Sequence, residues 1–210
     1  MVELAASARR AGRRALLSGR WLADTVVEVA PRVPVRDAAT LAAHHGGLTG
    51  PALADALVRS SGRVSAGIAG STGGLIAAQH VSVAGLLLVP FELAAETVLV
   101  VLTELKLVTE LHHVAGRPLP GGPLDRAGAV LMSWMSGRAA PARLAAAPAS
   151  RGALGAGGRR QLRRELRSRF TRNLTTVAPM LTGAAAAGYL NRRATLRVGR
   201  RVARDLGLRR

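Results

Sequence analysis

Between Val64 and Phe91 the chain runs for 28 residues without a formally charged side chain, and this stretch constrains its fold most. Small residues recur there and just before it at every fourth position: Gly62, Ala66, Gly70, Gly74 and Ala78. Residues four apart lie on one face of an α-helix, and small side chains let a second helix approach closely. The spacing therefore predicts a helix that packs through a small-residue face.

A second uncharged stretch, the 19 residues from Asn173 to Asn191, repeats this spacing at Ala184 and Gly188. We expect helices near residues 62–80 and 175–190 to pack against each other. Composition supports a helical chain, because the apolar 49% is mostly Ala, Leu and Val while aromatic residues make up 2%. Strands prefer β-branched and aromatic residues. The predicted fold class is all-α: a small-residue-packed helical bundle with a flexible Pro/Ala/Gly linker and a basic C-terminal helix.

Residues 64–91 are long enough to cross a bilayer, since a spanning helix needs about 20 apolar residues. The stretch also contains several glycines and hydroxyl side chains, together with Gln79 and His80, so its hydropathy is weak for a membrane span. From sequence, three arrangements stay open: the segment crosses the bilayer, dips into it, or is buried in protein.

Charge is concentrated at the C-terminus. The chain has a formal net charge of +18, and residues 151–210 hold sixteen Arg against two acids. Arg193, Arg197, Arg200 and Arg204 fall on one side of a helix counted at 100° per residue, while Ala194, Val198 and Val202 fall on another. Such a basic stripe beside an apolar one is typical of a helix that lies on anionic lipid, so we expect the four arginines to bind a membrane surface.

Clusters of proline and glycine along the chain suggest one domain with four parts. We expect a helical arm over residues 1–48, starting with a single helix from about Val2 to Ala30, and an apolar helical core over 49–116. Residues 117–158 are rich in Pro, Gly, Ala and Ser and predict a low-complexity linker around a short helix near Ala127–Met135. Residues 159–210 predict basic helices that pack on the core, with Leu162, Leu166, Phe170 and Leu174 on one apolar face.

After Pro90, the run to about Ala115 predicts an amphipathic helix. Its polar side chains, Glu92, Glu96, Thr103, Lys106 and Glu110, share one face. Glu104 lies apart from them. A carboxylate in so apolar a segment must face water, a cavity or a partner. We therefore predict that at least one of Glu92, Glu96 and Glu104 pairs with an Arg from the last fifty residues, the alternative being plain exposure to solvent.

Catalytic motifs are missing from the sequence. Glu110 and His113 have the Glu-x-x-His spacing of helical di-iron sites, but no second pair accompanies them, so they are weak metal candidates and Lys106–Glu110 pairing is the simpler interpretation. Residues 70–74 lack the lysine of a phosphate-binding loop. No Gly-x-Ser-x-Gly elbow occurs. We expect no catalytic residues, no cofactor and no small-molecule substrate, with a carboxylate/His metal enzyme kept as an alternative.

The N-terminal arginines resemble the start of a signal peptide, but no uninterrupted apolar region follows them, so the sequence predicts no signal peptide. Nucleic acid is the rival partner for so basic a chain. The basic region offers only Phe170 and Tyr189 for base stacking, and no zinc-finger or clear helix-turn-helix motif appears. A membrane surface is therefore the favoured partner, approached from the cytoplasmic side by a peripheral or partly inserted protein.

Three segments together resemble the EcsC-like family of bacterial helical proteins. They are SAGIAGSTGGLIA, ELKLVTELHHVAG and PMLTGAAAAGYLNRRATLRVGRRVARDL, and the resemblance covers residues 60–116 and 173–206. Ala115-Gly116 stands where the family usually has Tyr-Gly. The family takes its name from an operon that also encodes an ABC transporter and has no established enzymatic activity. The resemblance implies an accessory role at a membrane, with a membrane-protein partner, and marks Lys106, Glu110 and Asn191 as family-like polar positions.

Overall fold

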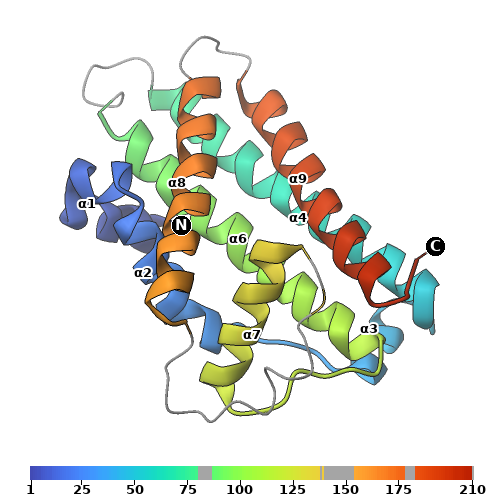
Figure 1. The fold of residues 1–210 in the computed structure, drawn as a ribbon. Coiled ribbons are helices and arrows are strands. Elements are labelled where there is room, and N and C mark those ends of the chain that lie inside the picture. Colours follow the sequence, from blue (N-terminus) through green and yellow to red (C-terminus); the bar gives the residue numbers. More distant parts are fainter. Residues whose placement is uncertain (80–86, 138, 140–153, 178–182, 210) are drawn as a thin grey trace.

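The computed structural model describes residues 1–210 apart from 80–86, 138, 140–153, 178–182 and 210. Within these residues every regular element is helical, which confirms the all-α prediction (Figure 1). The α-helices are α1 (Val2–Leu17), α2 (Arg20–Val29), α3 (Ala38–His44), α4 (Gly50–Gln79), α6 (Val89–Val114), α7 (Pro123–Ser136), α8 (Ala156–Val177) and α9 (Gly183–Asp205), with a short 3-10 helix at Ala30–Arg32.

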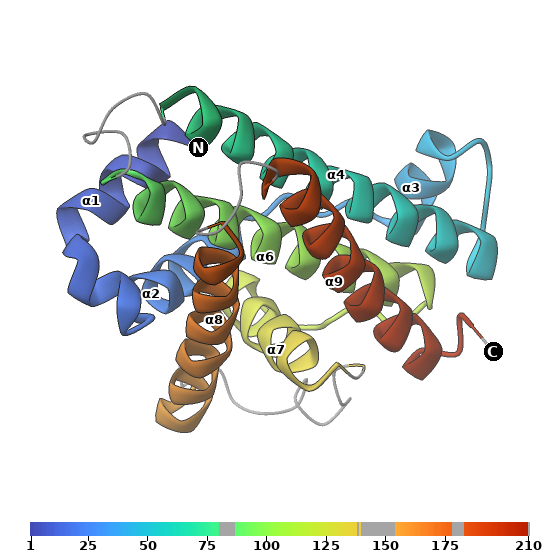
Figure 2. The same cartoon turned by 90° about the horizontal axis from the view of Figure 1, so that it is seen from above.

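Helix α6 is the centre of the molecule, and all the other α-helices contact it (Figure 2). The helix predicted from after Pro90 to about Ala115 is confirmed by α6, but the expected contrast between a polar and an apolar face does not appear in its burial. Glu96, Glu104 and Glu110 are each no more than 2% exposed, so polar positions of α6 are buried along with its apolar ones. Periodicity could not show this, because the polar side chains face neighbouring helices rather than water.

Helices α4 and α9 form the close pair that the small residues predicted. They run antiparallel, since Gly62 faces Leu196 whereas Ala66 faces Gly188. A Cβ atom on Gly188 would lie 3.2 Å from the Ala66 carbonyl oxygen. Small residues therefore do set the approach of these two backbones.

Gly62 and Ala66 lie in this contact as predicted, but the contact face of α4 then departs from the predicted row. Gly70 is exposed and has no atom within 4 Å of the position of a Cβ, so its assignment as a packing residue is wrong. Each step of four residues advances about 40° beyond a full turn of the helix, so successive positions in such a row move away from the interface. After Gly62, which was predicted, the buried positions are Ser65, Ala69 and Thr72. Gly74, Ala78 and Ala184 lie in the helices at positions whose side chains are not described.

The N-terminal segment forms α1 and α2 rather than the single helix predicted, and α1 is itself kinked at Gly12, which has a φ of 82° and a ψ of 160°. Gly19 separates α1 from α2 with a φ of 71°, and a Cβ there would lie 2.8 Å from the Arg163 carbonyl oxygen in α8. Only glycine suits this left-handed conformation at such close range. Trp21, Leu22 and Val26 of α2 are buried, so α2 is part of the core.

Part of the expected linker is also packed. Helix α7 contains the short helix predicted near Ala127–Met135, and Val130, Leu131 and Trp134 are buried in it. Residues 140–153 lie outside the described residues. Helix α8 buries Leu162, Leu166 and Phe170 completely, as the spacing predicted, with Leu174 partly buried.

No helix in the described parts of the chain combines the length and hydropathy needed to cross a membrane. Residues 64–79 of the long uncharged stretch belong to α4 and residues 89–91 begin α6, while 80–86 lie outside the description.

Candidate functional site

Glu104 of α6 is a buried acid with partners on several helices. It is 0% exposed, and its Oε2 accepts hydrogen bonds from Trp134 Nε1 at 2.6 Å and from Arg169 Nη1 at 2.8 Å. Its Oε1 lies 3.0 Å from Thr195 Oγ1, which lies 2.8 Å from Ser65 Oγ. One carboxylate thus links side chains from α4, α7, α8 and α9.

The Glu104–Arg169 ion pair confirms the prediction that an acid of this segment pairs with an arginine from the last fifty residues. The guanidinium also lies over the Trp134 ring, 4.8 Å from its centroid. A bonded, stacked arginine keeps one orientation, because each contact removes a rotation of its long side chain. Glu104 and Trp134 together therefore fix how α8 meets the core.

Glu96, two turns earlier on α6, is the second buried acid. It is 1% exposed, and its Oε1 accepts a hydrogen bond of 2.7 Å from Asn191 Nδ2 on α9. Burial raises the pKa of Glu96 above its ordinary value, and the hydrogen bonds from Asn191 and Thr72 offset part of that increase. Asn191, one of the family-like positions, thus acts as an amide partner for a carboxyl group that resists ionisation.

The other two family-like positions form a separate cluster. Lys106 Nζ lies 3.3 Å from Glu110 Oε1, which confirms the predicted pairing, and Arg36 Nε donates to the same oxygen at 3.0 Å. Glu96 and Glu110 lie about 21 Å apart along α6 at 1.5 Å per residue. Lys106, Glu110 and Asn191 therefore do not meet in one site.

Glu110 and His113 give no metal site in the described structure. Two cationic groups already occupy Oε1 of Glu110, and they would repel a metal ion there. No group of three or more His, Asp or Glu side chains with suitable spacing was found among the described residues. These contacts favour a structural role for Glu110.

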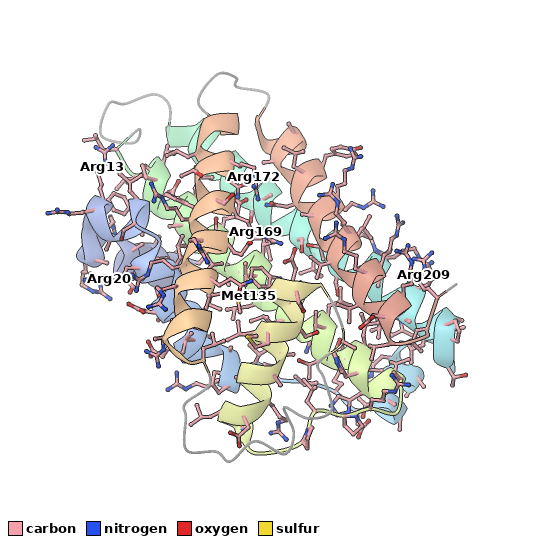
Figure 3. All side chains as sticks on the ribbon, viewed as in Figure 1. Arg13, Arg20, Met135, Arg169, Arg172 and Arg209 are labelled. Carbon is pink, nitrogen blue, oxygen red and sulfur yellow. The ribbon has the colours of Figure 1, made fainter. Side chains whose placement is uncertain are left out.

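Arg193, Arg197, Arg200 and Arg204 are all exposed, on the side of α9 away from the core. We call these four residues the α9 arginine row. The opposite side of the helix is buried at Asn191, Thr195, Gly199 and Val202. Side-chain nitrogens are seen along the outer side of α9 in Figure 3. The helix thus separates a positively charged outer face from a polar and small-residue inner one.

Two exposed apolar residues lie at the N-terminal end of the α9 arginine row. Tyr189 is 58% exposed and Leu190 is 46% exposed. The start of α9, the end of α8, the end of α4 and the start of α6 gather at the same end of the molecule (Figure 1). Exposed aromatic and aliphatic side chains beside arginines form an amphipathic surface at that end.

Sequence reasoning missed several residues of the interior cluster. Trp134, Ser65, Thr195 and Gly199 were not singled out, although Asn191, Thr195 and Gly199 follow one another at four-residue spacing. That spacing could have indicated a buried polar stripe on α9. The contact between Trp134 and Glu104 joins residues 30 positions apart and leaves no local signal.

No protein-family model, curated protein or solved structure matches this chain.

Proposed function

We propose that this chain is a non-enzymatic, membrane-associated helical protein that binds the anionic cytoplasmic surface of a membrane through the α9 arginine row. The observation that carries the proposal is the exposure of all four arginines on the side of α9 opposite its buried face. A row of cations on a rigid helix meets lipid phosphates without ordering a flexible segment first.

Tyr189 and Leu190 supply the apolar part of this surface. Both are more than 40% exposed at the end of α9 where the row begins. Interfacial helices combine basic side chains with aromatic or leucine side chains that enter the headgroup region. The surface is therefore suited to a peripheral or partly inserted protein.

Nucleic acid is a weaker partner for the same arginines. Phe170, one of two aromatic residues in the basic region, is 0% exposed and so cannot stack on a base. Tyr189 is the remaining candidate, and single-strand binding proteins generally stack several bases. Resemblance to the EcsC-like family adds a membrane-linked accessory role to the proposal, with a membrane-protein partner.

The test is flotation with vesicles of phosphatidylcholine alone or containing phosphatidylglycerol. The variant Arg193→Ala/Arg197→Ala/Arg200→Ala/Arg204→Ala loses four cations, each contributing on the order of 1 kcal/mol near an anionic surface. We expect its binding to anionic vesicles to fall by about a thousandfold. Vesicles of phosphatidylcholine alone should bind neither protein.

A matched control removes the same charge elsewhere. Arg9, Arg10, Arg13 and Arg14 of α1 are all exposed, and their fourfold alanine variant has the same net charge. It should keep most of the wild-type vesicle binding. Equal losses in both variants would mean that net charge alone drives binding and would refute the assigned surface. An electrophoretic shift with DNA at the same salt, lost in the α9 variant while flotation persists, would favour nucleic acid.

A further inference from the structure

A pocket of about 590 Å³ lies between α8 and α9, with α6 at its base. Five arginines line it: Arg169 and Arg172 from α8, and Arg193, Arg197 and Arg201 from α9. Figure 3 shows Arg169 and Arg172 on the side of α8 that faces α9. Its volume falls within the range of about 300–1,000 Å³ that small-molecule sites usually have.

The charge of this pocket is not balanced by its own lining. None of the described residues that line it is acidic. Arg169 is paired at 2.8 Å with Glu104, which is fully buried and does not line the pocket. The other four arginines have no carboxylate in the described lining, so the pocket carries an excess of positive charge that an entering anion offsets.

The guanidinium of Arg169 is already oriented before any ligand binds in the pocket. Glu104 and the Trp134 ring hold its guanidinium, and one of its N–H groups donates to Glu104. A guanidinium carries five N–H donors in a planar fork that matches phosphate oxygens. The remaining donors of an already oriented Arg169 can bind a phosphate with little further loss of side-chain freedom.

The rest of the lining is mixed. Asn173 and Thr97 add polar groups, whereas Leu190, Ala194 and Val198 form an apolar wall on α9. Leu190 is 46% exposed and continues this wall to the outer surface. A ligand that fits both parts carries a phosphate at one end and a short apolar segment at the other.

We infer that this pocket binds one phosphomonoester group, taken either from an anionic lipid headgroup or from a free phosphorylated metabolite. The inference deepens the proposed function, on which its lipid source rests, because the pocket opens beside the α9 arginine row. The row would attract the surface, and the pocket would select one headgroup from it. Arg193 and Arg197 belong to both the row and the pocket lining. Arg200 and Arg204 belong to the row alone, and Arg172 and Arg201 line the pocket alone, so the two steps can be tested separately.

The test compares two double variants that each remove two charges. Arg172→Gln/Arg201→Gln changes the pocket but not the α9 arginine row, and Arg200→Gln/Arg204→Gln changes the row but not the pocket. Calorimetry measures binding of dihexanoyl phosphatidic acid below its critical micelle concentration, of glycerol 3-phosphate, and of dihexanoyl phosphatidylcholine. Tryptophan fluorescence in a Trp21→Phe background gives a second readout, since Trp134 is then the remaining tryptophan and Arg169 lies over its ring.

We expect the pocket variant to bind phosphatidic acid on the order of a hundredfold more weakly, because two charge-assisted contacts are lost. The row variant should bind it as the wild type does. Tighter binding of phosphatidic acid than of glycerol 3-phosphate assigns the lipid source, and equal binding assigns a free metabolite. Wild-type affinity in the pocket variant, equal affinity for phosphatidylcholine, or no binding by the wild type overturns the inference.

Failure of the two proposals can be told apart. If vesicle flotation depends on the α9 arginine row but no soluble phosphate ligand binds, the pocket is wrong and the proposed function stands. If soluble ligands bind in the pocket but the fourfold row variant still floats, the membrane surface is wrong and the pocket stands as a metabolite site. Thermal unfolding of each variant verifies that it folds.

Discussion

Replacing Arg169 by Met tests whether the Glu104 cluster holds α8 to the core. Met keeps much of the length and volume of the arginine stem but removes its charge and donors. Among the described residues, the change leaves the Glu104 carboxylate, which is 0% exposed, with Trp134 and Thr195 as its partners. An ionised carboxyl group in that position loses its only cation among the described contacts.

The expected cost follows from the burial of the two groups. Removing one partner of a buried ion pair usually costs about 3–5 kcal/mol. The Arg169 side chain is 20% exposed, so water already weakens the pair and the lower value of about 3 kcal/mol applies. For a chain of 210 residues this lowers the Tm by about 6–12 °C.

A double-mutant cycle separates the pair from its surroundings. Urea unfolding would be followed by circular dichroism for wild type, Arg169→Met, Glu104→Gln and the double variant, with exposed Arg164→Met of α8 as control. The double variant should be more stable than the sum of the single losses predicts, with a coupling of about 1–3 kcal/mol. Additive losses, or an Arg169→Met variant as stable as the Arg164→Met control, would refute the assigned role.

Two further predictions concern the buried Glu96 of α6 and the glycines Gly199 of α9 and Gly70 of α4. Because burial raises the pKa of Glu96, the folded chain binds this proton more tightly than the unfolded chain, and its contribution to stability falls as pH rises above the ordinary value of 4.5. Glu96→Gln should therefore gain stability relative to wild type as pH increases in a urea-unfolding series, and a difference independent of pH would contradict this. A Cβ on Gly199 would lie 2.8 Å from Leu107 Cδ2 and 2.9 Å from Val58 Cγ2, so Gly199→Ala should lower stability by about 1 kcal/mol. Gly70→Ala, with nothing near it, should raise stability by about 0.5–1 kcal/mol through helix propensity, and equal effects at both glycines would refute the packing argument.

Local periodicity predicted the elements that bury one apolar face. Leu162, Leu166 and Phe170 recur at four-residue spacing and are fully buried in α8. The same reasoning placed the four arginines of the α9 row on one side of a helix, where all are exposed. In both cases the pattern and the burial have the same cause, because one side of the helix meets the core and the other meets water.

Periodicity did not predict burial on α6, because other helices surround it. The polar spacing of α6 predicted that one of its acids pairs with a C-terminal arginine, but it could not show which acid pairs, or that both Glu96 and Glu104 are buried by partners from other helices. Their partners Asn191 and Arg169 lie 95 and 65 residues away in sequence. Gly19 was missed for a related reason, since the approach of α8 that requires a glycine there arises only on folding. Such pairings are properties of the tertiary structure.

Arg169 connects the buried polar cluster around Glu104 with the pocket between α8 and α9. It is paired with Glu104 in the core and also lines the pocket between α8 and α9. A phosphate bound there would share the guanidinium with the buried carboxylate. Binding should therefore stabilise the folded chain, by an amount that grows with the logarithm of ligand concentration above the Kd. At the same ligand concentration, the Arg169→Met variant should be stabilised less than the wild type, because the guanidinium that contacts both the ligand and the core is gone.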